Sequence, residues 1–385
     1  MRALCRRWIW VLGQACAIAS MGLACSAWAA ESGFSFAVIG NGPFGSAEEP
    51  AARHLLDAIA RSAEPPRLII DTGNIKAPGE SCDDTLLLAR KAWLDSSPLP
   101  LFYAPGENEW IACQFGPNGG FDPRERLDFI REHFFDDDQS FGVAPMPLSR
   151  ESANARFRMY RENTRWQVGA KSDDKSGDIV FVTLNVPGDN NHYLNEGGRN
   201  GEFEERDVAN RAWLDRADTV ARHTHARAIV IVFEGDPQFE AGARHDRLFG
   251  WLRFDRQSAH DGYAELKQAL LKLTQRFDGP VLLIDGGIGP LATGYRIDEP
   301  LRDEHGARVA NFARLEVSGS PHLLQWVRVR VDPEHKQVFR IQLEKVAPLP
   351  PESAPAPAAP ESSAPSGVEA PKMLPLPPAD RPQGE

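Results

Sequence analysis

Residues 100–110 read PLFYAPGENEW, and this stretch decides the fold of the chain. The apolar run at 100–104 predicts a buried β-strand, and Pro105-Gly106 predicts the sharp turn that ends it. Polar residues follow this turn at once. Four other apolar runs end in the same way, with glycine beside a polar residue: Gly40-Asn41-Gly42-Pro43, Gly73-Asn74-Ile75-Lys76, Phe233-Glu234-Gly235-Asp236-Pro237 and Ile284-Asp285-Gly286-Gly287-Ile288-Gly289.

Strand and helix patterns alternate along the chain. Short apolar runs predict strands at 34–40, 67–72, 100–104, 179–186, 228–233 and 280–284. Periodic apolar residues with charges between them predict helices at 51–61, 84–94, 125–135, 203–223 and 263–277. Three closing strands without helices between them are predicted at 310–317, 323–331 and 338–344. The alternation favours a layered α/β fold, and the closing strands favour an antiparallel extension or a second sheet.

The five polar turns should meet in one place. In open α/β sheets the crevice that holds ligands lies at the carboxyl ends of the strands. Segments far apart in the sequence would therefore bring their polar residues together there. The carboxylates of these turns would make the crevice acidic; they belong to Glu107, Glu109, Glu234, Asp236 and Asp285.

The order and spacing of the turns resemble those of the calcineurin-like metallophosphoesterases. The strand ends of that family carry D-x-H, G-D, G-N-H-[DE], a single His and H-x-H. A bacterial exported branch whose third block reads close to PGDNEW is the most similar, and here that block is PGENEW at 105–110, followed by Cys113. The resemblance runs from about Phe34 to Glu344. It implies a four-layer β-sandwich flanked by helices, and a pair of cations that activates a water molecule.

The first three blocks depart from the family pattern. Asn41 and Pro43 occupy the D-x-H positions, and proline offers no side-chain ligand. Asn74 stands where the family has the Asp that bridges both metals. Asn108 is retained, but Glu109 replaces the His that acts as the catalytic acid. Neutral amides bridge two dications poorly, so these changes predict the loss of the metal pair.

The last two blocks depart as well. Glu234 matches the single His, while Gly287 and Gly289 fall on the H-x-H positions and offer no side chain for coordination. We therefore expect a non-catalytic binding or interaction module without a cofactor, whose partner is a protein or a small ligand. The alternative is a divergent phosphoesterase that uses a single Ca²⁺, Mg²⁺ or Mn²⁺ ion. Its ligands would come from the remaining carboxylates, including Glu107, Asp236 and Asp285.

The histidines lie outside these blocks. His223-Thr224-His225 imitates H-x-H, but it ends a helical pattern, where His suits the negative end of the helix dipole. His192 follows another predicted strand end and could approach the crevice, although a loop histidine is the commoner explanation.

The N-terminus predicts export. Arg2, Arg6 and Arg7 precede an uncharged, mostly apolar stretch at 8–25, and Ala27-Trp28-Ala29 supplies the small residues of a cleavage site. Residues 1–30 are therefore interpreted as a signal peptide that directs the chain to the periplasm or the exterior, without a stable membrane span after cleavage. A membrane anchor retained in the mature protein is the alternative.

Two cysteines remain after such cleavage. Cys82 and Cys113 each follow a predicted strand end, and a lone pair in an oxidising compartment favours a disulfide that ties two neighbouring loops. Two buried, unpaired thiols are the alternative.

Composition sets the remaining bounds. The net charge is −11 and no basic stripe occurs, which argues against nucleic-acid binding. A single folded domain is expected at 31–346. Residues 347–385 are rich in Pro, Ala, Ser and Glu, and are expected to form a disordered tail because they cannot bury enough apolar surface to offset the loss of chain entropy.

Overall fold

The structure is a computed structural model that describes residues 33–169, 178–194, 198–239, 260–287 and 291–349. Within these ranges the chain forms two β-sheets and six α-helices, in a compact unit that ends at Pro348. The predicted signal peptide at 1–30, the tail from 350 onward and Gly289 lie outside the described residues.

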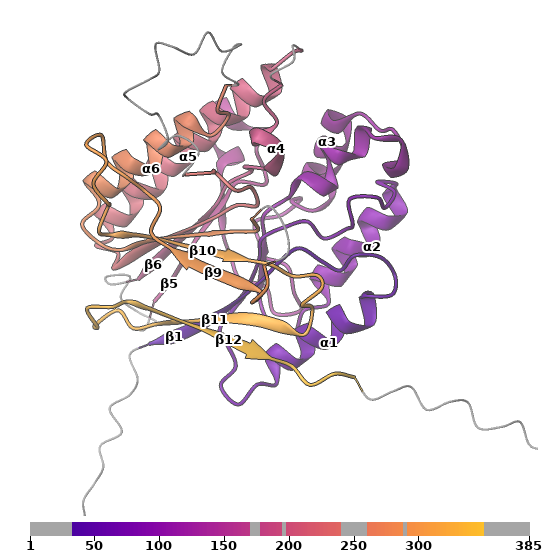
Figure 1. The fold of residues 1–385 in the computed structure, drawn as a ribbon, viewed down its shortest axis with the longest axis horizontal. Coiled ribbons are helices and arrows are strands. Elements are labelled where there is room, and N and C mark those ends of the chain that lie inside the picture. Colours follow the sequence, from indigo (N-terminus) through magenta and orange to yellow (C-terminus); the bar gives the residue numbers. More distant parts are fainter. Residues whose placement is uncertain (1–32, 170–177, 195–197, 240–259, 288–290, 350–385) are drawn as a thin grey trace, which may run out of the picture. The chain divides into compact units, whose positions relative to one another are not determined.

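The first sheet joins both ends of the folded unit. Its strand order is β12-β11-β1-β2-β3, and Figure 1 shows the first strand, in indigo, beside the last two, in yellow. β1, β2 and β3 are parallel, whereas β11 and β12 extend the sheet antiparallel to them. The strands are β1 (Phe34–Ile39), β2 (Ile69–Asp71), β3 (Leu101–Tyr103), β11 (Gln325–Val331) and β12 (Phe339–Lys345).

The second sheet has the order β4-β5-β6-β7-β8-β10-β9. Its four central strands, β6, β7, β8 and β10, are parallel, and antiparallel strands flank them. The strands are β4 (Ser149–Arg150), β5 (Thr164–Val168), β6 (Ile179–Thr183), β7 (Ala228–Val232), β8 (Val281–Asp285), β9 (Tyr295–Asp298) and β10 (Phe312–Val317).

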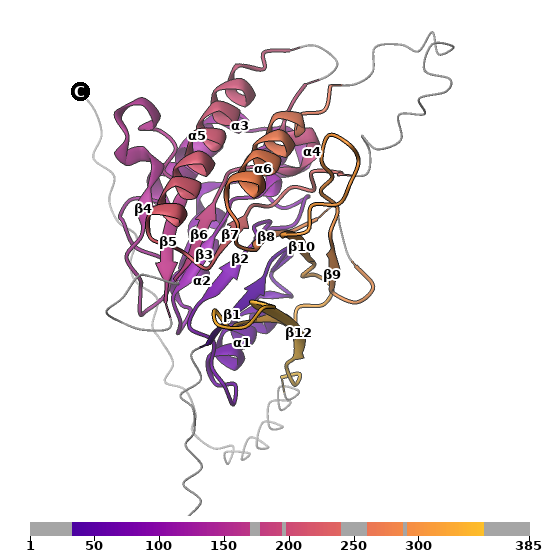
Figure 2. The ribbon, with the colours of Figure 1, turned by 90° about the vertical axis from the view of Figure 1, so that its left-hand side faces the viewer.

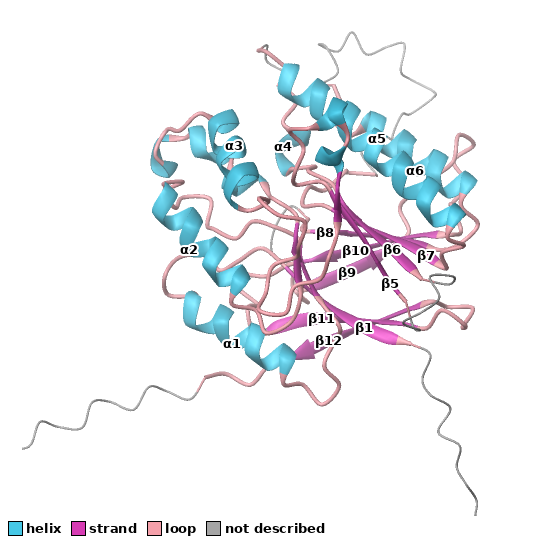
Figure 3. Ribbon diagram, turned by 180° about the vertical axis from the view of Figure 1, so that it is seen from behind, coloured by secondary structure: helices cyan, strands magenta, loops and turns pink. Residues whose placement is uncertain are grey.

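Helices cover the outer faces of both sheets. Figures 2 and 3 show α1 (Glu49–Ala60), α2 (Asp84–Asp95) and α3 (Pro123–His133) against the first sheet, and α5 (Gly201–His223) and α6 (Ala264–Arg276) against the second. Among the residues described, none of the helices combines the length and apolar character needed to cross a bilayer. The shorter elements are α4 (Gly188–Asn191) and 3₁₀ turns at Glu107–Glu109, Ala112–Gln114, Gly116–Asn118, Glu151–Ala153 and Ala155–Phe157.

Alternation along the strands produces the layers. In β1, Phe36 and Val38 face the core between the sheets, while Ala37 and Ile39 face the helices. Between the sheets, the rings of Phe102 and Trp166 stack with their centroids 3.6 Å apart. The expected α/β fold, with two sheets flanked by helices, is therefore confirmed.

The closing strands divide between the sheets. β10 joins β8 in the second sheet, whereas β11 and β12 form a hairpin on β1 in the first. The expected extension is thus confirmed for β11 and β12 only. The apolar pattern did not predict β4, β5, β9 and α4, because β4, β9 and α4 are very short and polar residues interrupt β5.

The predicted disulfide is present. Cys82 follows β2 and Cys113 follows β3, their Cα atoms are 5.6 Å apart, and both side chains are fully buried. The bond closes a loop of 31 residues and holds together the two turns that carry the polar residues of the first sheet.

Replacing both cysteines with alanine should lower the free energy of unfolding by about 3–4 kcal/mol, because the open loop gains entropy in the unfolded chain. Urea unfolding of the oxidised protein and the double variant measures this difference. A change below about 1 kcal/mol would contradict the stabilising role of the loop closure.

Candidate functional site

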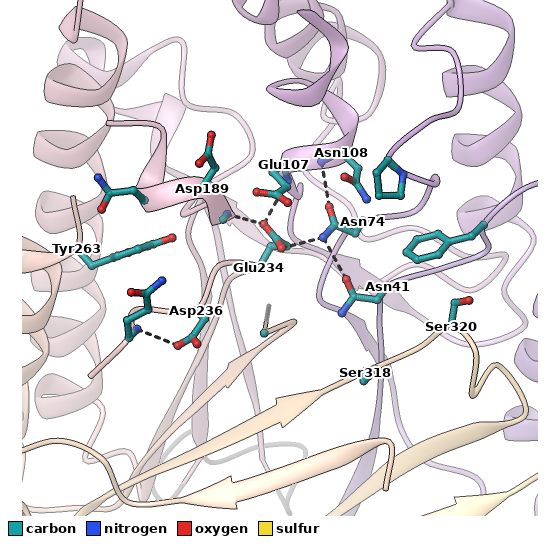
Figure 4. Close-up of a pocket in the computed structure, with 16 residues that line it drawn as sticks. Asn41, Asn74, Glu107, Asn108, Asp189, Glu234, Asp236, Tyr263, Ser318 and Ser320 are labelled. Atoms are coloured by element: carbon teal, nitrogen blue, oxygen red, sulfur yellow. Dashed lines mark hydrogen bonds between the residues drawn. The ribbon is translucent and has the colours of Figure 1, made fainter. Parts of the chain in front are cut away.

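The strand ends of both sheets line one cavity of about 480 Å³ (Figure 4). The first sheet contributes the turns after β1, β2 and β3, and the second contributes those after β6, β7, β8 and β10, as the sequence predicted for five of them. The described lining residues are Asn41, Phe44, Asn74, Pro78, Glu107, Asn108, Gly188, Asp189, Asn190, Glu234, Asp236, Gln238, Tyr263, Gly287, Ser318 and Ser320.

The carboxamide of Asn74 is at the centre of the cavity wall. Its Oδ1 accepts a hydrogen bond from the backbone N–H of Asn108 at 3.0 Å, which fixes the orientation of the amide. Its Nδ2 therefore faces two acceptors, Asn41 Oδ1 at 3.1 Å and Glu234 Oε1 at 2.8 Å. Only an amide can supply donors and an acceptor in this arrangement.

Asn41 continues the network to the second sheet. Its Nδ2 donates to the backbone carbonyls of Gly286 at 2.7 Å and of Val317 at 3.3 Å, the ends of β8 and β10. Both Asn41 and Asn74 have left-handed backbone conformations, with φ of 53° and 56°. Asparagine adopts this region more readily than most residues, so local geometry also favours it here.

Glu234 is buried and accepts hydrogen bonds on both oxygens. The backbone N–H groups of Glu107 and Gly188 donate to Oε2 at 3.2 Å and 2.8 Å, in addition to the bond from Asn74 to Oε1. Burial raises the pKa of Glu234 well above its usual value, and the neighbouring charge of Glu107 adds to this rise.

Glu109 lies apart from the cavity. It is fully buried, and its carboxylate accepts hydrogen bonds from the backbone N–H groups of Asn74, Ile75 and Gly106 at 2.6–3.2 Å. Burial is the main cause that raises the pKa of this carboxyl. The residue that resemblance equates with the catalytic acid thus caps the turns after β2 and β3. Asn108 does line the cavity, and its Nδ2 donates to Lys76 O at 3.0 Å.

Asp285 and Asp236 are both paired with Arg314 of β10. The guanidinium contacts both oxygens of the fully buried Asp285, at 2.7 and 2.8 Å, and an oxygen of Asp236 at 3.0 Å. Position 287 does not accommodate a metal-binding side chain in this arrangement, since a Cβ on Gly287 would lie 2.0 Å from Glu316 Oε1.

The site does not fit the pair of metal ions that the family resemblance implies. The amide of Asn74 donates into the bridging position, and Arg314 already neutralises two of the carboxylates. Within the described ranges, no three side chains of His, Cys, Asp or Glu are grouped closely enough to hold a metal ion.

The histidines have other partners. His192 lies beside the site, with Nδ1 3.2 Å from Glu202 Oε2 and its ring edge-on to Trp110. His223 ends α5 as predicted.

Three residues that line the cavity were not predicted from the sequence: Asp189, Tyr263 and Ser318. The polar run Gly188-Asp189-Asn190-Asn191, which follows a predicted strand, could have pointed to Asp189.

Comparisons with known proteins give partial overlaps. No family model matches the sequence, and no curated protein matches it. The alignment with the crystal structure of TT1561 of Thermus thermophilus covers 82% of this chain and 100% of that chain, with 11% identity and a TM-score of 0.42. The alignment with purple acid phosphatase PPD1 from seeds of yellow lupin, Lupinus luteus, covers 82% of this chain and 54% of that chain, with 10% identity and a TM-score of 0.37.

The substitution Asn74→Asp tests the amide network. It replaces the Nδ2 donor with an oxygen that faces the oxygens of Glu234 and Asn41, so at pH 7.5 we expect the free energy of unfolding to fall by about 2–4 kcal/mol. Asn154→Asp is the matched control, because Asn154 is exposed and its Oδ1, which aspartate retains, accepts from Arg156 N–H. Equal stability of Asn74→Asp and the wild type in chemical unfolding would contradict the assigned hydrogen bonds.

Asp71, at the end of β2, predicts a pH dependence. It is fully buried, Oδ1 accepts from Gly73 N–H at 2.8 Å, and Oδ2 has no partner in the described structure. Burial raises its pKa from 3.8 to about 8. The folded state therefore keeps a proton that the unfolded state releases above pH 4, so this carboxyl reduces stability as the pH rises from about 4 to about 8.

Asp71→Asn should remove this contribution while retaining the Oδ1 acceptor. Relative to the wild type, the variant should gain stability between pH 4.5 and pH 8.5, on the order of a few kcal/mol. Urea unfolding of both proteins at the two pH values measures the gain. If the free energies of unfolding of the two proteins differ by the same amount at both pH values, Asp71 is ionised in the folded state and the prediction is wrong.

Proposed function

We propose that this protein is an exported binding module, which holds a ligand in the strand-end cavity and does not hydrolyse phosphate esters. The observation that carries this proposal is the hydrogen-bonded amide of Asn74, which connects Asn41 and Glu234. A hydrolytic metal pair requires a bridging anion at such a position, whereas Asn74 offers hydrogen-bond donors there.

The shape of the site supports binding. The cavity is open enough to hold a small molecule, and its wall mixes apolar groups with several polar groups that converge from two sheets. Buried hydrogen bonds of Asn74, Glu109 and Asp285 hold the elements that form this wall. A wall that is rigid before the ligand arrives reduces the entropy lost on binding.

Export remains part of the proposal. The basic and apolar N-terminal segment and its small-residue cleavage site support it, as does the disulfide between Cys82 and Cys113, a bond typical of oxidising compartments. N-terminal sequencing of the protein recovered from the periplasm or the medium tests it directly, since a mature chain should begin close to residue 31.

The second candidate, a phosphoesterase with one cation, has weaker support. Its ligands would include Glu107, Asp236 and Asp285, and the last two already share the charge of Arg314. A cation there would have to displace a buried guanidinium or share its carboxylates, which costs electrostatic free energy.

An activity assay separates the two candidates. We expect no hydrolysis of p-nitrophenyl phosphate or bis-p-nitrophenyl phosphate by the mature protein with added Mn²⁺, Mg²⁺ or Ca²⁺, and less than one equivalent of bound metal in elemental analysis. Asn108→Ala is the control for contaminating enzymes, because true turnover in the cavity should respond to this wall residue. Metal-dependent turnover that Asn108→Ala abolishes would overturn the proposed function.

A further inference from the structure

The charge of the cavity wall is one-sided. Four carboxylates line it, those of Glu107, Asp189, Glu234 and Asp236, and Figure 4 shows the first three grouped together. No Lys, Arg or His occurs among the described lining residues. A negative wall enclosed by protein attracts cations and repels anions more strongly than an open surface does.

Two of these carboxylates have no counter-charge in the described part of the chain. Within the described residues, no hydrogen bond or ion pair connects the side chain of Glu107 or Asp189 to another group, whereas Glu234 is satisfied by three N–H donors and Asp236 by Arg314. Burial raises the pKa of Glu107, and the neighbouring charge of Asp189 adds to this rise. A ligand cation would relieve this repulsion.

The wall also contains an independent sign of an absent hydrogen-bond partner. Ser318 is 5% exposed and lines the cavity, yet its Oγ makes no hydrogen bond in the described structure. A buried hydroxyl without a partner costs about 1–3 kcal/mol, so a partner supplied by a ligand would stabilise the site.

Aromatic side chains complete the wall. Tyr263 and Phe44 line the same cavity, and the hydroxyl of Tyr263 is held by the carbonyl of Pro187 at 3.0 Å. The negatively polarised faces of aromatic rings attract ammonium groups, and the effect strengthens when water is excluded.

The neighbouring buried cations are already engaged. Lys76 donates from Nζ to the carbonyls of Ala77 and Asn108, and Arg314 is held by Asp285 and Asp236. Neither lines the cavity. Among the described lining residues a phosphate group would therefore meet carboxylates and no basic side chain, and their charge would oppose its binding.

We propose that the cavity binds a small organic cation with a primary ammonium group, held by Glu107 and Asp189. This inference rests on the proposed function, because it names the class of ligand for the same cavity. An ammonium group donates three hydrogen bonds and spreads its contacts over separated acceptors. A hard metal ion needs several converging oxygens, and in the described part of the chain no three His, Cys, Asp or Glu side chains are grouped to hold one.

Isothermal titration of the mature protein with 1,4-diaminobutane, at pH 7.5 and low salt, tests the inference. We expect saturable binding that Glu107→Gln and Asp189→Asn each weaken by about tenfold, because each removes one charged contact. Neither carboxylate makes a contact that the fold requires, so both variants should unfold at the wild-type urea concentration. Glu132→Gln, an equal change of charge at an exposed position of α3, should leave the affinity unchanged.

Three results would overturn the inference: no binding of 1,4-diaminobutane by the wild type, equal binding by the Glu107→Gln variant, or tighter binding of inorganic phosphate than of the diamine. Titration with Ca²⁺ and Mg²⁺ provides a further arm, since binding of these ions in place of the diamine would favour an inorganic cation. The failure of diamine binding leaves the absence of hydrolysis intact, whereas metal-dependent turnover would overturn the proposed function whatever the diamine does.

Discussion

The nitrogen of the Asn74 side chain donates two hydrogen bonds, to Asn41 and to Glu234, and the ends of both sheets depend on it. Apolar packing holds the sheets together, but such contacts have little direction and do not decide which polar groups meet at the strand ends. The amide supplies that direction, because its oxygen is fixed by the backbone of Asn108 and its nitrogen must then face the two acceptors. The hydrogen bonds of Asn41, Asn74 and Glu234 therefore fix the central part of the cavity wall.

The acidic residues at the strand ends fall into two groups with different roles. Glu109 and Asp285 are fully buried and satisfied, the first by backbone N–H groups and the second by Arg314, so they stabilise turns and strands. Glu107 and Asp189 line the cavity and have no such partners among the residues that the structure describes. Burying a charge without compensation is costly, so an acidic residue that stays uncompensated beside a cavity is more informative about a ligand than one that is paired.

Much of the fold could be predicted, and the failures have a common cause. The central strands and the long helices were found because they bury a regular apolar pattern, as in β7 and α6. β5 and β9 were missed because they are short and contain few apolar residues, and only their pairing with β6 and β10 makes them strands. Five of the seven turns that line the cavity were identified from their glycines and polar residues, but Tyr263 and Ser318 were not, since no local pattern marks them.

The sequence by itself determined the layered α/β class, the strand-end location of the polar turns and the pairing of Cys82 with Cys113, because each depends on local periodicity, turn chemistry or a simple count. Tertiary structure alone decided which acids face the cavity and which are neutralised. Arg314 lies 29 residues from Asp285 and 78 from Asp236, and only the parallel pairing of β10 with β8 brings the guanidinium to both. Electrostatic compensation acts through distance in space, which sequence separation does not reveal.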